Sequence, residues 1–391
     1  MSEPRVVVIG AGIVGLSTAF ELLRLGAEQV TVLEARHPGE GSSGRSVGMV
    51  ETQYLDAADI EVRAFGHARF GALSREHGLS FVRGGYLRMA HDQADLDRFA
   101  ESVARQAQFE IHDATVLLPR DIEARWPQLD VTDRAGALFG PSDGYVDGYE
   151  CCTLLARLVR EAGGDIVLNA ELTAVESAPQ GRVLVTEKGR FPADVVVNAA
   201  GGWAGRVGDL LDAPIPLAPQ LHGAVAIELD GPMTPLLPFV MDYVPGSGTD
   251  GVYFRSERPD QLIAGLHTDE AIHRAVSPDV ALGPVSHDFV ERVSALMAQR
   301  MTDCDGFAVG RSWTGIYPMT PDHRPIVGTH PEAADVVCAA GAGGSGIQLS
   351  PAMARMAAEE IVNGKVTTFS SDTGWATARV CPSADRFERS H

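Results

Sequence analysis

The stretch Val6-Val-Val-Ile-Gly10-Ala-Gly12-Ile-Val-Gly15 decides the fold of this chain, together with Val30-Thr-Val-Leu-Glu34 further along. An apolar strand runs into a glycine-rich turn, the turn opens a helix, and a second apolar strand ends in an acidic residue. This order and spacing are typical of a βαβ unit that binds a dinucleotide.

Each glycine of this fingerprint, and the acid that ends it, has its own physical task. Gly10 permits the tight turn, Gly12 lets the backbone approach a pyrophosphate, and Gly15 lets the helix pack closely on the strand. The helix N-terminus offers unpaired N–H groups and the positive end of its dipole to the phosphates. Glu34 can accept hydrogen bonds from a ribose diol.

The composition narrows the class of protein. The chain has 391 residues, enough for two or three domain-sized units, and a net charge of −20, which disfavours nucleic acid and anionic membranes as partners. No apolar stretch is as long as a membrane span, and the N-terminus lacks a signal-peptide pattern. Five cysteines without a CxxC motif indicate reduced thiols and no metal site. We therefore expect a cytoplasmic enzyme.

Two further strand–glycine units follow the first one. Apolar strands at 194–198 and 336–340 each run into a glycine-rich turn, whereas 214–309 contains alternating strands separated by Pro and Gly. The pattern predicts an α/β fold, with a Rossmann-like nucleotide domain interrupted by an inserted α+β substrate domain on an antiparallel sheet. The expected ranges are 1–80, 145–213 and 310–370 for the nucleotide domain, 81–144 and 214–309 for the substrate domain, and 371–391 for a polar tail that forms a surface arm.

Five motifs in order carry a family resemblance. Besides the fingerprint, they are Gly41-Ser-Ser-Gly-Arg45-Ser, Asn198-Ala-Ala-Gly201-Gly-Trp203, Trp313-Thr-Gly-Ile-Tyr317-Pro, and Gly341-Ala-Gly-Gly-Ser-Gly346. The chain resembles the FAD-dependent D-amino acid oxidase superfamily, and most of all its sarcosine oxidase, glycine oxidase and dimethylglycine dehydrogenase branch. The resemblance implies a glutathione-reductase-like FAD domain and oxidation of a C–H bond beside an amine nitrogen, with hydride transfer to flavin N5.

The resemblance also implies roles for individual residues. Glu34 would bind the adenosine ribose and Arg36 would flank the adenine, and Leu172 lies where main-chain groups of the family hold the adenine. The loop around Ser42 would meet the phosphates and ribityl chain, and the segment from Gly343 would face the isoalloxazine. The cofactor-binding candidates are Gly10, Gly12, Ile13, Val14, Gly15, Glu34, Ala35, Arg36, Ser42, Ser43, Arg45, Ser46, Leu172, Ala200, Gly201, Gly343, Gly344, Gly346, Ile347 and Gln348.

The chain departs from the family where a substrate carboxylate is held. Glu51 and Gln348 stand where monomeric sarcosine oxidases carry an arginine and a lysine, and Tyr317 stands where glycine oxidase has an arginine. A buried carboxylate without a cation is costly, so we do not expect a plain α-amino acid in the usual pose. Glu51 either attracts an ammonium or hydroxyl-rich substrate or pairs with a nearby arginine. Arg255 is either a replacement cation or a structural ion-pair partner.

Three further side chains complete the catalytic candidates, which are His267, Glu51, Tyr317, Tyr253 and Arg255. His267 falls where sarcosine oxidases place a histidine near the substrate, although a histidine at a strand end is often only a satisfied polar residue. Tyr253 and Tyr317 either line the pocket as phenol donors or are core aromatics. His222 is a weaker candidate.

Three places in the chain bear on the electron acceptor and on the flavin linkage. Ile263 stands where family oxidases place an oxygen-activating lysine, which favours a dehydrogenase that uses another acceptor than oxygen. Gly315 replaces the linking cysteine of sarcosine oxidases, and Arg45-Ser46 replaces the Trp-His pair of dimethylglycine dehydrogenases, so we expect non-covalent FAD. The alternatives are oxidation of a carbinol carbon in a hydroxyacid or polyol, and a flavin subunit of a larger, oligomeric dehydrogenase.

Overall fold

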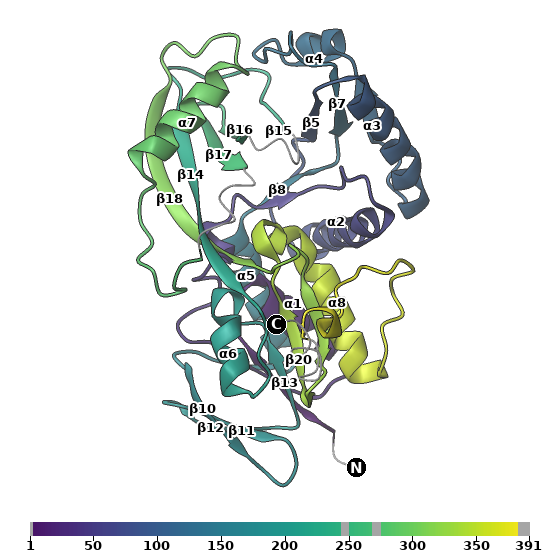
Figure 1. Cartoon of the computed structure of the whole chain (residues 1–391), viewed down its shortest axis with the longest axis vertical. Coiled ribbons are helices and arrows are strands. Elements are labelled where there is room, and N and C mark those ends of the chain that lie inside the picture. The colour runs from purple at the N-terminus through teal and green to yellow at the C-terminus, as the bar shows by residue number, and fades with distance from the viewer. Residues whose placement is uncertain (1–2, 244–249, 268–274, 382–391) are drawn as a thin grey trace, which may run out of the picture.

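The computed structural model describes residues 3–243, 250–267 and 275–381. The predicted βαβ unit consists of β1 (Arg5–Ile9), α1 (Ile13–Arg24) and β2 (Gln29–Leu33), and the two strands are parallel and adjacent. This unit lies in the lower half of the molecule in Figure 1, and a second large sheet forms the upper half.

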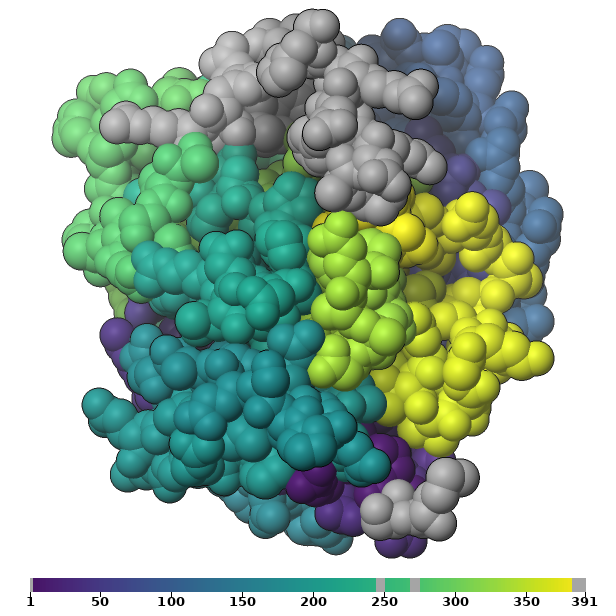
Figure 2. Space-filling model, turned by 60° about the horizontal axis from the view of Figure 1, so that its bottom comes forward, coloured from purple at the N-terminus to yellow at the C-terminus, as the bar shows by residue number. Residues whose placement is uncertain are grey.

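The βαβ unit belongs to a six-stranded sheet assembled from distant parts of the chain. The strand order is β19-β20-β13-β1-β2-β9, and only β19 runs antiparallel to its neighbour among these described strands. Figure 2 shows N-terminal, central and C-terminal segments meeting on one face of the molecule. The remaining strands are β9 (Asp165–Val167), β13 (Val195–Asn198), β19 (Ile326–His330) and β20 (Ala333–Ala340).

Successive side chains of a strand point to opposite faces of the sheet, and other elements cover both faces. Val6 and Val8 pack with α1, α5 (Gly148–Glu161) and α8 (Gly346–Asn363). Val7 and Ile9 pack in a separate core on the other face. That core is covered by β10 (Leu172–Ser177), β11 (Arg182–Thr186), β12 (Gly189–Ala193) and α6 (Ala204–Leu210).

The second large sheet has eight strands in the order β18-β14-β17-β16-β15-β5-β7-β6. One face packs on α4 (Pro119–Arg125) and α7 (His287–Ala298), and α3 (Gln93–Gln106) covers the end near β7. The strands are β5 (Tyr86–Ala90), β6 (Thr115–Leu117), β7 (Gly136–Gly140), β14 (Ala218–Glu228), β15 (Phe239–Asp242), β16 (Gly251–Arg258), β17 (Gln261–His267) and β18 (Ala308–Met319).

The substrate domain is built on an antiparallel sheet, as expected, with one parallel pair among the described strands. β15 runs parallel to β5, with Phe239 opposite Tyr86, while the other described pairs of this sheet are antiparallel. Strands β5 and β15 are far apart in the chain, so no short hairpin constrains their direction. The sheet is therefore joined from two separate stretches at this parallel seam.

The predicted boundary at residue 310 is also wrong, because it falls inside β18. This long strand pairs with β14 as far as Met319, so the motif that begins at Trp313 belongs to the eight-stranded sheet. A small third sheet connects the two halves, with β8 (Gly144–Val146) between β3 (Met49–Val50) and β4 (Phe81–Val82). The long helix α2 (Ala57–His77) runs beside it (Figure 1).

The first part of the tail is not a surface arm. Trp375 is only 4% exposed, and its carbonyl accepts a hydrogen bond of 2.8 Å from the Val327 amide in β19. The burial of a large indole explains this docking, since it removes much apolar surface from water. Residues 382–391 of the expected arm lie outside the described residues.

Helix α8 contains a proline in its second turn. It starts at Gly346, so Pro351 lies inside it. Proline has no N–H to donate to the carbonyl four residues earlier. The Ser350 hydroxyl donates to that carbonyl, Ile347 O, at 2.9 Å.

The described helices include no candidate for a membrane-spanning segment. The cytoplasmic location stays a prediction.

Candidate active site

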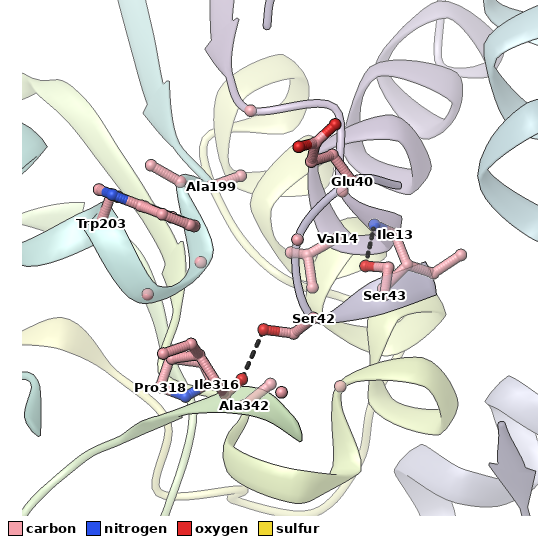
Figure 3. A pocket seen from close by; sticks show the side chains of 18 of the residues that line it. Ile13, Val14, Glu40, Ser42, Ser43, Ala199, Trp203, Ile316, Pro318 and Ala342 are labelled. Atoms are coloured by element: carbon pink, nitrogen blue, oxygen red, sulfur yellow. Dashed lines mark hydrogen bonds between the residues drawn. The ribbon is translucent and has the colours of Figure 1, made fainter. Parts of the chain in front are cut away.

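A cavity of about 410 Å³ lies at the carboxyl end of the six-stranded sheet (Figure 3). Its walls are formed by the glycine turn after β1, the end of β2, the loop of residues 41–46 (the serine loop) and the turn after β20. Of the described cofactor-binding candidates, only Gly15 and Gln348 stand outside its lining. The motifs singled out in the sequence therefore converge on one space.

The glycine turn after β1 is shaped by close backbone contacts. Gly10 has φ of +102°, and a Cβ there would lie 2.6 Å from the Ala199 carbonyl oxygen. A Cβ on Gly15 would lie 2.0 Å from the Gly10 carbonyl oxygen, so Gly15 serves the packing of α1 on the turn. Gly12 caps α1 without a side-chain hydrogen bond, and the helix N-terminus faces the cavity.

The serine loop closes the cavity from the side. Ser43 Oγ accepts a hydrogen bond of 3.0 Å from the Ile13 amide, and Ser42 Oγ donates to the Ile316 carbonyl at 2.5 Å (Figure 3). Arg45 also lines the cavity, and its Nε is buried without a hydrogen-bond partner among the described residues. A buried donor of this kind indicates an anionic group that fills the space beside it.

The acid at the end of β2 is held in place by backbone amides. Glu34 accepts hydrogen bonds of 2.7 Å from the Ala11 amide and 2.8 Å from the Arg36 amide. The Arg36 side chain pairs with Glu40 at 2.7 Å, and Leu172 contributes an apolar wall nearby. These residues fit an adenosine ribose and its base, as the helix N-terminus and Arg45 fit a pyrophosphate.

The family model of FAD-dependent oxidoreductases, DAO, matches residues 5–360. This chain belongs to the DAO family. The family is one of FAD-dependent oxidoreductases, and the cavity described above fits FAD.

Three relatives are about one quarter identical to this DAO-family chain over the aligned residues. Mouse mitochondrial sarcosine dehydrogenase is 26% identical over 379 residues, which cover 93% of this chain and 40% of that protein. Glycine oxidase of Geobacillus kaustophilus is also 26% identical, over 93% of this chain and 94% of its own. The crystal structure of L-proline dehydrogenase from P. horikoshii superposes with a TM-score of 0.83 at 28% identity and covers 99% of this chain and 98% of its own. The chain thus spans about two fifths of the sarcosine dehydrogenases and nearly the whole length of the other two.

A second cavity, of about 540 Å³, opens beside the FAD cavity. The inner face of the eight-stranded sheet forms much of its wall, with His222 on β14, Tyr317 on β18, Tyr253 on β16 and His267 on β17. The two cavities share the lining residues Ser46, Val47, His222, Tyr253, Tyr317, Ala342, Gly343, Gly344 and Ile347. A substrate in the second cavity therefore reaches the space that fits FAD.

His222 and Tyr317 form one unit at this junction. Their rings stack with centroids 3.8 Å apart, and a Cβ on Gly344 would lie 2.5 Å from the Tyr317 ring. His222 Nε2 is buried without a hydrogen-bond partner among the described residues. Burial, and to a smaller extent the charge of His267, lowers the pKa of His222 to about 4. The imidazole is therefore neutral near pH 7.

Tyr253 and His267 lie on the neighbouring strands. Tyr253 is 7% exposed and stacks on Phe239 at 5.6 Å, and burial raises its pKa well above the usual value, so the phenol keeps its proton. His267 is exposed and meets the edge of the Tyr243 ring at 4.4 Å. Of the two histidines, His222 is the one at the cavity junction, although the sequence had favoured His267.

Glu51 is the acid paired with an arginine. It is fully buried, its Oε2 accepts a hydrogen bond of 2.6 Å from the Gln53 amide, and its Oε1 is 3.9 Å from Arg88 Nη2. The Glu51 amide donates to Gln348 Oε1 at 3.3 Å. Burial raises the pKa of Glu51, against the opposing influence of Arg88 and Arg63. Neither Glu51 nor Gln348 is among the described residues that line the second cavity.

Arg255 has the structural role rather than that of a replacement cation. Its guanidinium pairs with Glu257, donates to the Val47 carbonyl at 3.2 Å, and stacks 3.4 Å from the Tyr145 ring centre. It is not among the described residues that line either cavity. The arginines that do line the second cavity are Arg63, Arg88 and Arg324, which the sequence analysis missed.

Proposed function

We propose that this enzyme uses FAD to oxidise a C–H bond next to the nitrogen of a secondary amine or an N-substituted amino acid. The observation that carries the proposal is the neutral imidazole of His222, whose unpartnered Nε2 lies where the second cavity meets the FAD cavity. The N–H of a neutral amine is a donor that fits such an acceptor.

The weak basicity of His222 decides how the amine binds. Its pKa of about 4 is far below that of an alkylammonium group, for which lysine gives a reference of about 10. His222 therefore orients the neutral amine by accepting its N–H, and does not take up the ammonium proton. The nitrogen lone pair then remains free to assist cleavage of the adjacent C–H bond.

The bond changes balance without another oxidant than the cofactor. FAD, when bound, supplies the redox chemistry by accepting the hydride equivalent at N5. The neutral amine loses hydride from carbon and becomes an iminium ion, which water hydrolyses to a carbonyl compound and an amine. Tyr253 and Tyr317 keep their phenolic protons because burial raises both pKa values, and their rings form walls of the cavity junction.

The names of the relatives support this substrate class. Sarcosine and proline, named in two of them, are secondary amines that carry a carboxylate. Glycine, named in the third, is a primary amine. The substrate of this chain is accordingly an amino-acid-like amine rather than a polyol.

Anaerobic visible spectroscopy of the holoenzyme tests the proposal. Sarcosine, L-proline, pyrrolidine and glycolate are added separately, and reduction of FAD is followed as loss of the flavin absorption. Reduction by at least one secondary amine, with none by glycolate, is the expected result. Reduction by glycolate alone would replace the proposal with oxidation of a carbinol carbon. If none of the panel and no further amine reduces the flavin while dithionite does, the proposal fails.

A further inference from the structure

Two polar side chains of strand β5 point into the second cavity. Tyr86 and Arg88 are two residues apart, so they lie on the same face of the strand. Both line the cavity, whereas Leu87 and Met89 between and beyond them belong to the apolar core on the opposite face. Their cross-strand partners on β15, Phe239 and Met241, line the cavity as well.

The Tyr86 hydroxyl has no hydrogen-bond partner among the described residues. The side chain is 0% exposed, its ring stacks on Phe239 with centroids 5.3 Å apart, and its hydroxyl makes no hydrogen bond to any described residue. A buried hydroxyl without a partner is costly, and such groups are normally satisfied in the functional state. The phenol keeps its proton, because burial raises its pKa well above the usual value. The hydroxyl can therefore donate a hydrogen bond to a ligand.

Arg88 supplies a cation beside this hydroxyl. Its Nε donates to the Gln53 carbonyl at 3.0 Å, and its Nη2 is 3.9 Å from Glu51 Oε1, beyond hydrogen-bond distance. The guanidinium centre is 5.6 Å from the Tyr86 ring, and the side chain keeps 19% of its surface exposed where it lines the cavity. The guanidinium thus faces the cavity, and its ion-pair partner Glu51 lies too far away to accept a hydrogen bond from it.

A second arginine adds positive charge from helix α2. Arg63 stacks 3.4 Å from the Tyr54 ring centre, and its Nε is buried without a partner among the described residues. Its Nη1 pairs with Asp59 at 2.6 Å, on a carboxylate that is 45% exposed to solvent. The arginine therefore leaves a second unsatisfied donor beside the same cavity, whose wall also includes Tyr54.

We propose that Arg88 and the Tyr86 hydroxyl bind the carboxylate of an amino-acid substrate. They take over from the cations that sarcosine oxidases carry at the positions of Glu51 and Gln348. Only β15 separates β5 from β16, so Arg88 lies about 10 Å along the sheet from Tyr253. Two long side chains and a small amino acid fill that span, with the amine toward His222. The inference rests on the proposed amine oxidation for the other end of the substrate.

The binding of propionate to the holoenzyme, measured by isothermal titration calorimetry, tests the anion site without any turnover. Propionamide is the uncharged match. We expect propionate to bind the natural enzyme and to bind Arg88→Gln roughly 10- to 100-fold more weakly, because a charge-assisted hydrogen bond is lost. Tyr86→Phe weakens propionate roughly three- to tenfold. Binding of propionamide changes little in either variant.

Arg182→Gln is the matched control. Arg182 is also on a strand, pairs with Asp335 at 2.7 Å, and is 16% exposed, but it lies on β11 away from the second cavity. Its substitution should leave propionate binding unchanged. If Arg88→Gln fails to fold, Arg88→Lys keeps the charge but loses the planar fork, and Tyr86→Phe removes only an oxygen atom.

An activity measurement adds the link to the substrate. Arg88→Gln raises the KM for L-proline, and it raises the KM for pyrrolidine, which lacks the carboxylate, by a much smaller factor. Equal binding of propionate by all variants, or no binding by the natural enzyme, would overturn the anion site. If propionate binding depends on Arg88 but no amine reduces FAD, the anion site stands and the proposed function fails.

Discussion

At the scale of single residues, His222 carries the consequences that are easiest to measure. Replacement by leucine removes the acceptor for the substrate N–H, so we expect FAD reduction by the amine to slow roughly 10-fold or more. Glutamine restores an acceptor oxygen and part of the rate. Stopped-flow reduction under anaerobic conditions measures both variants.

The pH profile of this reaction distinguishes orientation from proton uptake. Since the pKa of His222 is about 4, the histidine itself does not titrate between pH 6 and 9. The rate of reduction rises with pH as the bound ammonium loses its proton. A His222→Leu variant with the rate of the natural enzyme would show that the imidazole does not touch the amine.

Glu51 makes carboxylate binding dependent on pH. Burial raises its pKa above the ordinary value of about 4.3. Below that raised pKa the side chain is neutral and leaves Arg88 to the ligand, and above it the ionised carboxylate competes. Propionate affinity should therefore fall as the pH rises through the pKa of Glu51. The charged or titratable groups around Glu51 are Arg63 on α2, Arg88 on β5, and Tyr54, Tyr86 and Asp143.

Glu51→Gln imitates the neutral acid at every pH and keeps an oxygen for the Gln53 amide. We expect propionate to bind this variant with an affinity that no longer changes with pH between 5 and 8, as calorimetry would show. A pH dependence that persists unchanged would instead identify Asp143, whose pKa burial also raises, as the titrating group.

The residues of the site differ in how visible they are in the sequence. The FAD side follows from local motifs, because Gly10, Gly12 and Glu34 act through turns and strand ends that lie close in the chain. The substrate side depends on cross-strand neighbours. Arg88 and Tyr86 become recognisable only once β5 is known to pair with β15 and to turn one face to the cavity.

At the scale of elements, the turn between β1 and α1 contains one glycine needed for packing, Gly15, and one needed for FAD binding, Gly12. Gly15→Ala places a Cβ 2.0 Å from the Gly10 carbonyl oxygen, so we expect a loss of about 1–3 kcal/mol in the free energy of unfolding. Gly12→Ala meets only Ser43 Oγ at 3.4 Å and leaves the fold intact. Its methyl group obstructs the pyrophosphate and weakens FAD binding roughly tenfold, or about 1.4 kcal/mol.

Thermal unfolding of the FAD-free proteins and titration with FAD separate the two effects. The interpretation predicts that Gly15→Ala lowers the unfolding temperature of the FAD-free protein, while Gly12→Ala does not. If Gly12→Ala retains the full affinity for FAD, the turn does not approach the pyrophosphate as closely as the fingerprint implies.

Elements with a strong local signal could be predicted well, and those fixed by distant contacts could not. The strand and helix around the glycine turn have apolar periodicity and clear ends. The start of α8 is hidden because Ser350 compensates for Pro351. The extent of β18 depends on its long pairing with β14, and the docking of Trp375 depends on β19, which the tail composition does not reveal.

At the scale of the whole molecule, the distribution of lysine bears on the electron acceptor. The chain has only two lysines, Lys188 and Lys365, and neither is among the described residues that line the cavities. With no ammonium beside the FAD cavity to stabilise a reduced oxygen species, we expect reoxidation by oxygen to be slower than by a dye acceptor, roughly tenfold or more. Mixing the reduced holoenzyme with each acceptor measures this ratio.

Rapid turnover with a stoichiometric yield of hydrogen peroxide would contradict this prediction and identify an oxidase. Ile263, the position matched to the oxygen-activating lysine of family oxidases, is not among the described residues that line either cavity.

The order of strands in the six-stranded sheet has a consequence for biosynthesis. β1 at residues 5–9 pairs with β13 at 195–198, which in turn pairs with β20 at 333–340. At about 5–20 residues per second, a ribosome needs roughly 17–68 s to reach residue 340. Until then the nascent chain has a glycine turn but no closed cradle around it. FAD capture is therefore an event of the finished chain, and no N-terminal fragment that stops before β20 should retain the flavin.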